Sequence, residues 1–488
     1  MSVLVFEGFL STPEMLALLE PASVVQTMMD FEAALARAQG RCGVIPLPAA
    51  QAIASLCRVE LYDLPALVEA SGPAGSLAIP VLQKLADTVA LFDPAAAGYV
   101  HWGSSSQDMV DTTLVLLLRR SLRLIEDDLL TLIGHLLELA DQQPGVPVLA
   151  RTLMQPAQIS SLRTRVLNWA MPLLRSAQAL RLVADEALQL QFGGAVGTLA
   201  SLGERADAVS AALAAELQLP EPAMPWHTQR DRMVRLGAEL GILCGALGKL
   251  ARDLAWLCQP EVAELAQRLP DTREAERGFK RGACSVMPHK SNPVAFLRAL
   301  AAAERAPQRV AALLACMPQE LERGLGGWQA ELAEMSGLLL HAHGSVRALA
   351  EGVAGLQVFP ARMREQIDAQ QGLVFAEALN LLMSPVLGRE AAYAWVERLC
   401  QQVQTRPWHG NSFAGSTGPA AAAPETSLQS LALREAAEQG LTPHRLDPAA
   451  LAGVFNVGVA TAHADRRVAS VLANARQQWA ALTDRPHW

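Results

Sequence analysis

Residues 113–140, TLVLLLRRSLRLIEDDLLTLIGHLLELA, decide the fold of this chain. Apolar residues recur there at intervals of three or four positions, so they line one face of a helix. The residues of this face are Leu114, Leu118, Leu122, Ile125, Leu129, Leu132, Leu136 and Ala140. A helix of this length spans about 40 Å. The sequence DQQPGVP that follows contains the proline and glycine that end helices.

The same pattern predicts four further long helices later in the chain. They are expected at residues 159–190, 228–257, 293–316 and 328–350. Aromatic residues make up only 5% of the chain and β-branched runs are scarce, which argues against an all-β fold. Five long helices indicate an extended bundle, and their wide apolar faces predict burial against other subunits, hence an oligomer.

The predicted fold is therefore all-α, with three helical domains. Residues 1–112 form the first, and residues 113–358 form the central bundle of long helices. Residues 359–488 form the third, which contains a loop rich in glycine, alanine, proline and serine at 409–427.

Three glycines mark one face of the helix expected at 228–257. They are Gly237, Gly241 and Gly245. Each glycine costs about 1 kcal/mol relative to alanine inside a helix. The ridge therefore predicts that another helix approaches closely, although drift of composition in an alanine- and glycine-rich sequence is the alternative.

The composition of the chain excludes several classes of partner. The net charge is −8 and no basic block is present, so nucleic acid is not expected. The seven cysteines are scattered and form no CxxC pair, which indicates reduced thiols rather than a disulfide framework or a zinc site. No apolar run approaches the ~20 residues of a membrane span, and the first residues lack the basic region of a signal peptide. We expect a soluble, cytoplasmic protein with no membrane partner.

Three polar clusters interrupt the apolar sequence in front of predicted helices. They are HWGSSSQDMVDT at 101–112, RTLMQPAQISSL at 151–162 and PWHTQRDRM at 225–233. Hydroxyl and amide groups placed before a helix can donate hydrogen bonds to an anion. Each cluster also has a simpler interpretation, because serine and aspartate cap helices and a lone histidine such as His227 is more often structural.

A fourth cluster, ACSVMPHKSNP at 283–293, joins two predicted helices. Pro288 and Pro293 stiffen this loop, because proline fixes its own backbone dihedral φ. Lys290 supplies a positive charge and Asn292 an amide donor. Preorganised donors and a cation stabilise developing negative charge, so the loop is predicted to hold an anionic intermediate.

These clusters resemble the signature regions of the fumarase/aspartase superfamily. SVMPHKSNP is similar to its signature loop SSxMPxKxNP, GSSSQDMVDT to its first region and RTLMQPAQ to its second. The resemblance covers essentially the whole chain. It implies a cofactor-independent enzyme with no bound metal. It also implies a homotetramer with a twenty-helix core, in which each active site combines clusters from different subunits.

Within the superfamily the chain resembles the lactone-forming cycloisomerases more than adenylosuccinate lyase. The lyases carry a histidine in the second region, held by a glutamate seven residues beyond the loop lysine. Leu153 and Leu297 stand at these positions here. Losing only one member of a buried histidine–glutamate pair would leave the other buried and unpaired, which would destabilise the protein. Both members are therefore absent together. Their absence suits lactone formation, in which the leaving or attacking group is a substrate carboxylate that needs little help from an acid. Further similar stretches are DFEAALARAQGRCGVIP, FGGAVGTLASLG, ERGLGGWQAE and LDPAALAGVFN.

This resemblance implies a reaction on a small tricarboxylate. A carboxylate of 3-carboxy-cis,cis-muconate would add across a double bond, as a step in aromatic catabolism through the protocatechuate branch. Electrons would move to the opposite carboxylate and give an enolate-like anion. A fumarate-releasing lyase related to adenylosuccinate lyase and a non-catalytic helical scaffold are the alternatives.

The resemblance also implies roles for single residues. The acid/base serine of the superfamily is replaced by Cys284, so Cys284 or the adjacent Ser285 is expected to protonate carbon, and altered activity is a third possibility. Cys284 could also be a small apolar filler. Lys290 is expected to stabilise the anion. His101 is either a second acid/base candidate or simply a hydrogen-bond donor to a substrate carboxylate. The residues expected to bind substrate are Ser104, Ser105, Ser106, Gln107, Arg151, Thr152, Gln155, His227, Thr228, Arg230, Met287 and Asn292.

Overall fold

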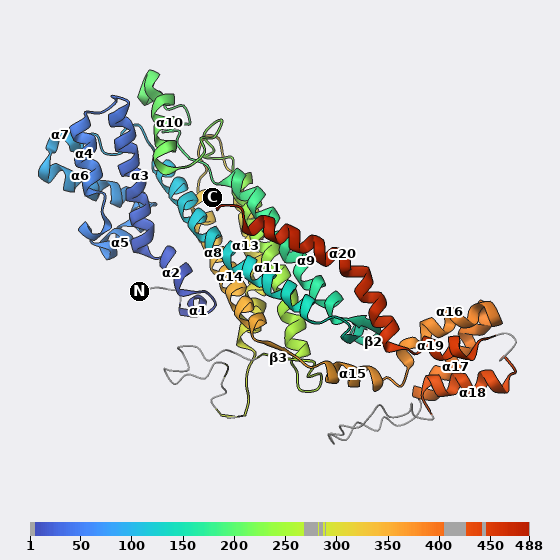
Figure 1. Ribbon diagram of the computed structural model, residues 1–488. Coiled ribbons are helices and arrows are strands. Elements are labelled where there is room, and N and C mark those ends of the chain that lie inside the picture. Colours follow the sequence, from blue (N-terminus) through green and yellow to red (C-terminus); the bar gives the residue numbers. More distant parts are fainter. Residues whose placement is uncertain are drawn as a thin grey trace.

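The computed structural model describes residues 5–267, 282, 286–287, 289–404, 426–441 and 446–487. Helices account for nearly all regular structure in these ranges, so the predicted all-α class is confirmed. The described chain is elongated, with the long helices in the middle and a group of shorter helices toward either end (Figure 1). The predicted proton donors Cys284 and Ser285, and residues 409–425 of the loop expected at 409–427, lie outside the described residues.

The five predicted long helices are present. They are α8 (Ser106–Gln142), α9 (Leu162–Ala187), α11 (Asp231–Leu257), α13 (Val294–Cys316) and α14 (Gly327–Ala354). All residues of the predicted apolar face of α8 are buried. Helix α8 begins earlier than its apolar pattern indicates, because its first turns bury polar side chains instead. Ser105 caps it: the Ser105 hydroxyl accepts from the Asp108 N–H, and the Asp108 carboxylate accepts from the Ser105 N–H.

The helices before the bundle pack on α8 chiefly through α3 (Pro21–Arg41). Phe31 and Leu35 lie in the buried face of α3. The other helical elements of this region are α1 (Val5–Gly8), α2 (Pro13–Leu18), α4 (Leu47–Leu56), η1 (Val59–Leu61), α5 (Leu64–Ala74), α6 (Ala78–Phe92) and α7 (Pro94–Ala97). Between α9 and α11, η2 (Ala200–Arg205) leads into α10 (Ala206–Leu217), which packs on α3.

Two small antiparallel sheets accompany the helices. Strands β1 (Pro147–Thr152) and β2 (Gln155–Ser161) form a hairpin, and β3 (Leu265–Gln267) pairs with β4 (Leu356–Val358). The second polar cluster thus forms a hairpin, and the predicted helix start at 159 is wrong by three residues because the strand continues to Ser161.

The chain after the bundle forms a second, smaller core and then returns. The elements of this part are α15 (Pro360–Asp368), η3 (Leu373–Phe375), α16 (Ala376–Leu387), α17 (Arg389–Gln404), α18 (Leu428–Glu438), α19 (Pro448–Val454) and α20 (Val457–Thr483). Leu379, Trp395 and Leu431 belong to the small core. Helix α20 then runs back along α9 and α8, where the Trp479 indole N–H donates to the Leu130 carbonyl at 2.8 Å. The division into three domains at 112 and 358 stays a prediction.

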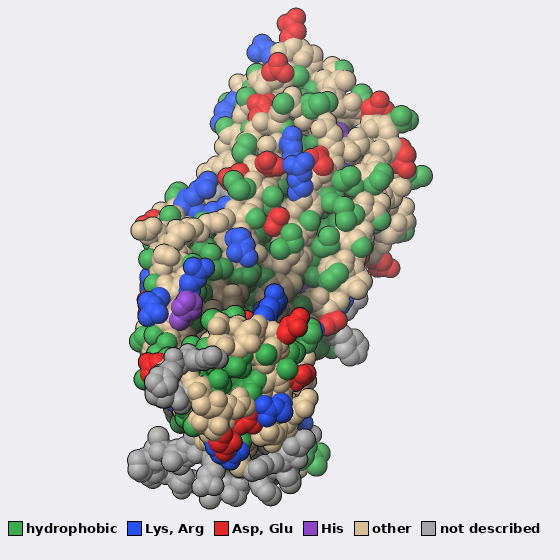
Figure 2. Space-filling model, turned by 90° about the vertical axis from the view of Figure 1, so that its right-hand side faces the viewer, with side chains coloured by type: hydrophobic (Ala, Val, Ile, Leu, Met, Phe, Trp, Pro, Cys, Tyr) green, Lys and Arg blue, Asp and Glu red, His purple; other side chains and the backbone are tan. Residues whose placement is uncertain are grey.

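Charges of both signs are interspersed on the molecular surface. Lys and Arg side chains lie beside Asp and Glu side chains on the face in Figure 2, and hydrophobic side chains reach the surface between them. None of the described helices combines the length and the apolar character that a membrane crossing requires. Several large side chains of the long helices are exposed, including Leu182 on α9, Ile242 and Trp256 on α11, and Leu314 on α13.

The predicted close helix approach is confirmed at two of the three glycines. A Cβ at Gly237 would overlap Leu313, and one at Gly241 would overlap Val310, both residues of α13. Gly245 has open space instead. Each four-residue step turns a helix by about 40° beyond a full turn, so the third glycine has rotated away from α13.

Gly241→Ala should therefore destabilise the protein by about 1–3 kcal/mol, because the added methyl group overpacks the α11–α13 contact. Gly245→Ala is the matched control in the same helix. It should be neutral or stabilising by up to about 1 kcal/mol, because alanine favours the helix and meets no atom. Denaturant unfolding of both variants measures the difference, and equal effects would contradict the contact with α13.

Candidate active site

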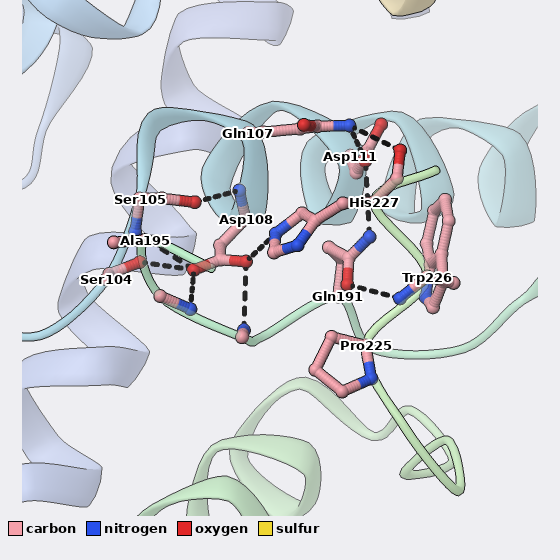
Figure 3. A network of polar contacts seen from close by, with 12 residues as sticks. Ser104, Ser105, Gln107, Asp108, Asp111, Gln191, Ala195, Pro225, Trp226 and His227 are labelled. Atoms are coloured by element: carbon pink, nitrogen blue, oxygen red, sulfur yellow. Dashed lines mark hydrogen bonds and ion pairs between the residues drawn. The ribbon is translucent and has the colours of Figure 1, made fainter. Parts of the chain in front are cut away.

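The carboxylate of Asp108 is the centre of a buried polar network at the start of α8 (Figure 3). It is fully buried. Its oxygens accept hydrogen bonds from the Ser105 N–H at 2.9 Å, the Ser104 hydroxyl at 3.4 Å, the Gly193 N–H at 3.0 Å, the Gly194 N–H at 2.8 Å and His227 Nε2 at 2.7 Å. These donors satisfy both oxygens of the buried carboxylate, so Asp108 holds the serine segment, the 193–194 backbone and His227 together.

A second carboxylate on the next turn of α8 binds Arg230. The guanidinium donates to both oxygens of Asp111 at 2.8 and 3.0 Å and to both oxygens of Glu331 at 3.1 and 2.6 Å. All three side chains are fully buried, and the Trp226 ring covers the guanidinium at 4.9 Å. Burial lowers the pKa of Arg230, but Asp111 and Glu331 outweigh it and raise that pKa. The pKa of Glu331 is raised by burial, which Arg230 opposes.

Gln107 joins this network to the connection between α13 and α14. Its amide N–H groups donate to Asp111 at 3.1 Å and to the His227 carbonyl at 2.9 Å, and its oxygen accepts from Arg323 at 3.1 Å. Arg323 also donates to the Gly194 and Ala195 carbonyls at 3.1 and 2.9 Å. Among the described residues, Arg323 contacts only neutral oxygens, so it is a cation without a carboxylate partner.

The structure thus brings together five of the predicted residues at this end of the bundle: Ser104, Ser105, Gln107, His227 and Arg230. Ser106 is half-buried at the first position of α8, and the Thr228 hydroxyl donates to the Leu321 carbonyl at 3.0 Å. His101 lies beside Ser105, the N-cap of α8, and its Nδ1 is hydrogen-bonded to Glu32 Oε1 on α3 at 2.6 Å.

The hairpin residues lie at the opposite end of the bundle. Arg151 and Arg165 both donate to Glu264, at 3.1 and 2.9 Å, and Glu264 is fully buried. Thr152 and Gln155 are exposed on either side of the turn. The turn consists of Leu153 and Met154, with left-handed φ angles of 50° and 67°. Both side chains are exposed, Leu153 to 96%.

The described part of the signature loop is also exposed. The Lys290 N–H donates to the Met287 carbonyl at 3.1 Å and the Asn292 N–H to the Gly282 carbonyl at 2.8 Å. Gly282 has a φ of 75°, and a Cβ there would overlap the Asn292 backbone, so glycine is required at this turn. The side chains of Met287 and Lys290 point away from the core.

The length of the helices separates these clusters within one chain. His227 and Arg230 directly precede α11, whereas Glu264 follows its end. The 27 residues of α11 span about 40 Å. The signature loop belongs to the Glu264 end, because Gly352 near the end of α14 packs against both Phe296 at the start of α13 and Gln267 of β3.

Sequence reasoning missed the partners that hold the predicted residues. Asp108, Asp111, Glu331 and Arg323 carry the network, and none of them was among the predicted site residues. All four nevertheless fall in quoted motifs: Asp108 and Asp111 in GSSSQDMVDT, and Arg323 and Glu331 in ERGLGGWQAE. Among the described residues, no group of three or more His, Cys, Asp or Glu side chains is arranged to hold a metal ion.

A protein-family model described as a lyase matches residues 11–306. The chain therefore belongs to this lyase family, as the resemblance to the fumarase/aspartase superfamily predicted.

Within the family, the chain is similar to enzymes named for one reaction. It is 43% identical over 397 residues to the 3-carboxy-cis,cis-muconate cycloisomerase of Pseudomonas aeruginosa, which covers 81% of this chain and 85% of that relative. It is 39% identical over 400 residues to the enzyme of the same name from Bradyrhizobium diazoefficiens, covering 82% and 87%. The crystal structure of the 3-carboxy-cis,cis-muconate lactonizing enzyme from Pseudomonas putida matches with a TM-score of 0.83 and 35% identity, over 98% of this chain and all of that one.

Replacing Arg230 should be among the most damaging changes at this site. Arg230→Met leaves two buried carboxylates without a cation and should cost about 3–5 kcal/mol of unfolding free energy. Arg235→Met is the matched control, because Arg235 lies one turn further along α11 and is 61% exposed in its pairs with Glu186 and Asp231. That control should cost less than about 1 kcal/mol. Thermal and urea unfolding compare the two, and a small loss for Arg230→Met would disprove the role of the buried pairs.

Proposed function

We propose that this protein is a cofactor-independent cycloisomerase that converts 3-carboxy-cis,cis-muconate into 4-carboxymuconolactone. The observation that carries the proposal is the similarity to cycloisomerases of this name over about four-fifths of the chain, at 43% and 39% identity. The reaction would place the enzyme in the protocatechuate branch of aromatic catabolism, with the expected cytoplasmic location.

The proposed reaction forms one bond to carbon, creates an anion and then protonates carbon. A substrate carboxylate oxygen bonds to an alkene carbon, and the displaced electron pair moves toward the opposite carboxylate. Lys290 and Asn292 stabilise that charge, and Cys284 or Ser285 gives a proton to carbon. The donor regains its proton from solvent, so one proton is consumed for each carboxylate that becomes a neutral lactone.

We assign substrate binding to polar side chains that can make hydrogen bonds beyond those formed within the chain. The side chains of Gln107, His227 and Arg230 are committed to partners within the chain, so we assign them to shaping and supporting the pocket. Ser104, Ser106 and Thr228 lie at the edge of that network. Arg323 extends the predicted set, because a substrate carboxylate would supply the counter-charge that it lacks among the described residues.

A homotetramer would bring the two ends into one site. Lys290 and Gln155 belong to one end of the bundle and Gln107 to the other, about 40 Å apart by helix length. Antiparallel association of bundles places one end of a subunit beside the opposite end of its neighbour. The exposed apolar side chains of α9, α11 and α13 support such burial.

The alternatives have less support. A fumarate-releasing lyase of the adenylosuccinate type would need the histidine–glutamate pair, and exposed leucines occupy both positions: Leu153 and the half-exposed Leu297. A non-catalytic scaffold is favoured only by the replacement of the superfamily's serine by Cys284, and the presence of Lys290 and Asn292 argues against it.

The activity is tested by following the loss of ultraviolet absorbance of 3-carboxy-cis,cis-muconate. Wild type should consume it, and should release no fumarate from adenylosuccinate. Of Cys284→Ala and Ser285→Ala, one should lower kcat by about 10²–10⁴-fold, because a positioned proton donor contributes this much. Full activity in both variants would exclude both residues as donors.

The shared site is tested by mixing two inactive variants. Lys290→Met removes a cation from one end of the bundle, and Arg323→Met removes a cation from the other end. Each variant alone should therefore be nearly inactive. After unfolding and joint refolding in equal amounts, roughly a quarter of the sites should combine two intact contributions and recover activity. Lys290→Met mixed with a Lys290→Ala variant is the control that should recover none. Mixed tetramers without recovered activity would refute a site built from both ends.

A further inference from the structure

Glu32 and His101 form a buried pair directly beside the candidate active site. His101 Nδ1 lies 2.6 Å from Glu32 Oε1, although the residues are 69 positions apart. The Glu32 side chain is 1% exposed and that of His101 is 16% exposed. The ring lies next to Ser105 and Asp108, which both influence its charge. The pair therefore joins α3 to the start of α8.

Helix α3 contacts the residues that precede α8 at two points, His101 and Trp102. Two turns after Glu32, the Gln39 amide N–H donates to the Trp102 carbonyl at 2.6 Å. His101 has a left-handed φ of 58°, a strained backbone conformation for a non-glycine residue. Contacts that maintain such a backbone conformation fix where the His101 ring points.

Each side chain of the Glu32–His101 pair has one polar atom that could make a further hydrogen bond. His101 Nε2 and Glu32 Oε2 are both enclosed, and neither has a hydrogen-bond partner among the described residues. An enclosed polar atom without a hydrogen-bond partner destabilises the folded protein. The free Nε2 is therefore suited to a ligand that accepts a hydrogen bond, and the adjacent hydroxyls of Ser104 and Ser105 belong to the same site.

The surroundings favour the charged form of the ring. Burial alone would lower the pKa of His101, but the Glu32 carboxylate outweighs it, with smaller contributions from Asp108 and the Ser105 backbone, and the pKa is raised. The other titratable groups near the pair are Cys57, Arg37 and Asp30. Burial, Glu32 and Asp30 raise the pKa of the Cys57 thiol, and Arg37 opposes them.

We propose that Glu32 is a positioning residue that holds His101 as an imidazolium, with Nδ1–H directed to Glu32 and Nε2–H available to a carboxylate of the substrate. The inference rests on the proposed function for the identity of that carboxylate. Both ring nitrogens then act as donors, which a neutral imidazole cannot achieve. Glu32 itself touches no substrate and acts through the ring.

Stability as a function of pH tests the pair without any substrate. Because the pKa of His101 is raised in the folded protein, the pair stabilises fully below the ordinary histidine pKa of about 6.5 and loses this contribution as pH rises through the folded value. Glu32→Gln should therefore lower Tm by several degrees at about pH 6 and by clearly less at about pH 9. Gln39→Leu is the matched control on the same face of α3. It should lower Tm equally at both pH values, since it removes an uncharged contact.

An equal loss for Glu32→Gln at both pH values would overturn the proposal, as would the same pH dependence in Gln39→Leu. If Glu32→Gln does not fold, His101→Gln carries the test from the other side of the pair. Its stability loss must likewise shrink as pH rises, and a loss that does not would equally overturn the proposal.

Kinetics with 3-carboxy-cis,cis-muconate test the role of the ring. The ratio of the KM of Glu32→Gln to the KM of wild type should increase at least about threefold between pH 6.5 and pH 8.5. The reason is that the His101 ring, without the Glu32 carboxylate, loses its proton in this range. The kcat should change less. A KM ratio that is independent of pH would overturn the positioning role. If wild type does not turn over this substrate, the proposed function fails, while the Tm series still decides whether Glu32 holds the charge of His101.

Discussion

The rigid length of the central helices is the constraint on which the rest of the structure depends. Helix α8 has 37 residues and α11 has 27, so these rods span about 55 and 40 Å. Every polar cluster is attached to one end of such a rod, and a helix does not fold back to join its ends. The chain therefore carries two separate polar ends, which the proposed homotetramer would combine into one site. In that proposal, the exposed tip at Leu153 and the exposed residues around Lys290 would be covered by another subunit.

Buried charge at the start of α8 is organised around carboxylates. Asp108 accepts from backbone and side-chain donors, and Asp111 shares Arg230 with Glu331. Placing ionised groups in the interior is tolerable only when each is paired and hydrogen-bonded. The result is a stiff framework that presents Ser104, Ser106 and Arg323 at its edge. Preorganisation of this kind lets donors stabilise a developing anion without rearranging during the reaction.

The proposed cycloisomerase chemistry fits single side-chain differences on this framework. The resemblance implies a histidine and a glutamate at 153 and 297 in fumarate-releasing lyases, whereas this chain has leucines there and keeps the loop cation Lys290. A lactone-forming reaction needs the cation, because an enolate-like charge develops. It does not need the acid at that position, because the attacking group is a carboxylate. The pairing of Glu32 with His101 would add a second donor that keeps its charge near neutral pH.

The sequence by itself determined the long helices, the close approach at Gly237 and Gly241, and the motifs that contain candidate residues. These follow from local periodicity and from short patterns, which neighbouring residues encode. It could not show the hairpin at 147–161, because a short strand pattern beside a helix resembles the helix entrance. Only the tertiary structure decided that Arg230 is committed to Asp111 and Glu331, that Arg323 reaches Gln107, and that Glu32 holds His101. Arg230 and Glu331 are 101 positions apart, and burial selects such partners by spatial proximity, which no local pattern records.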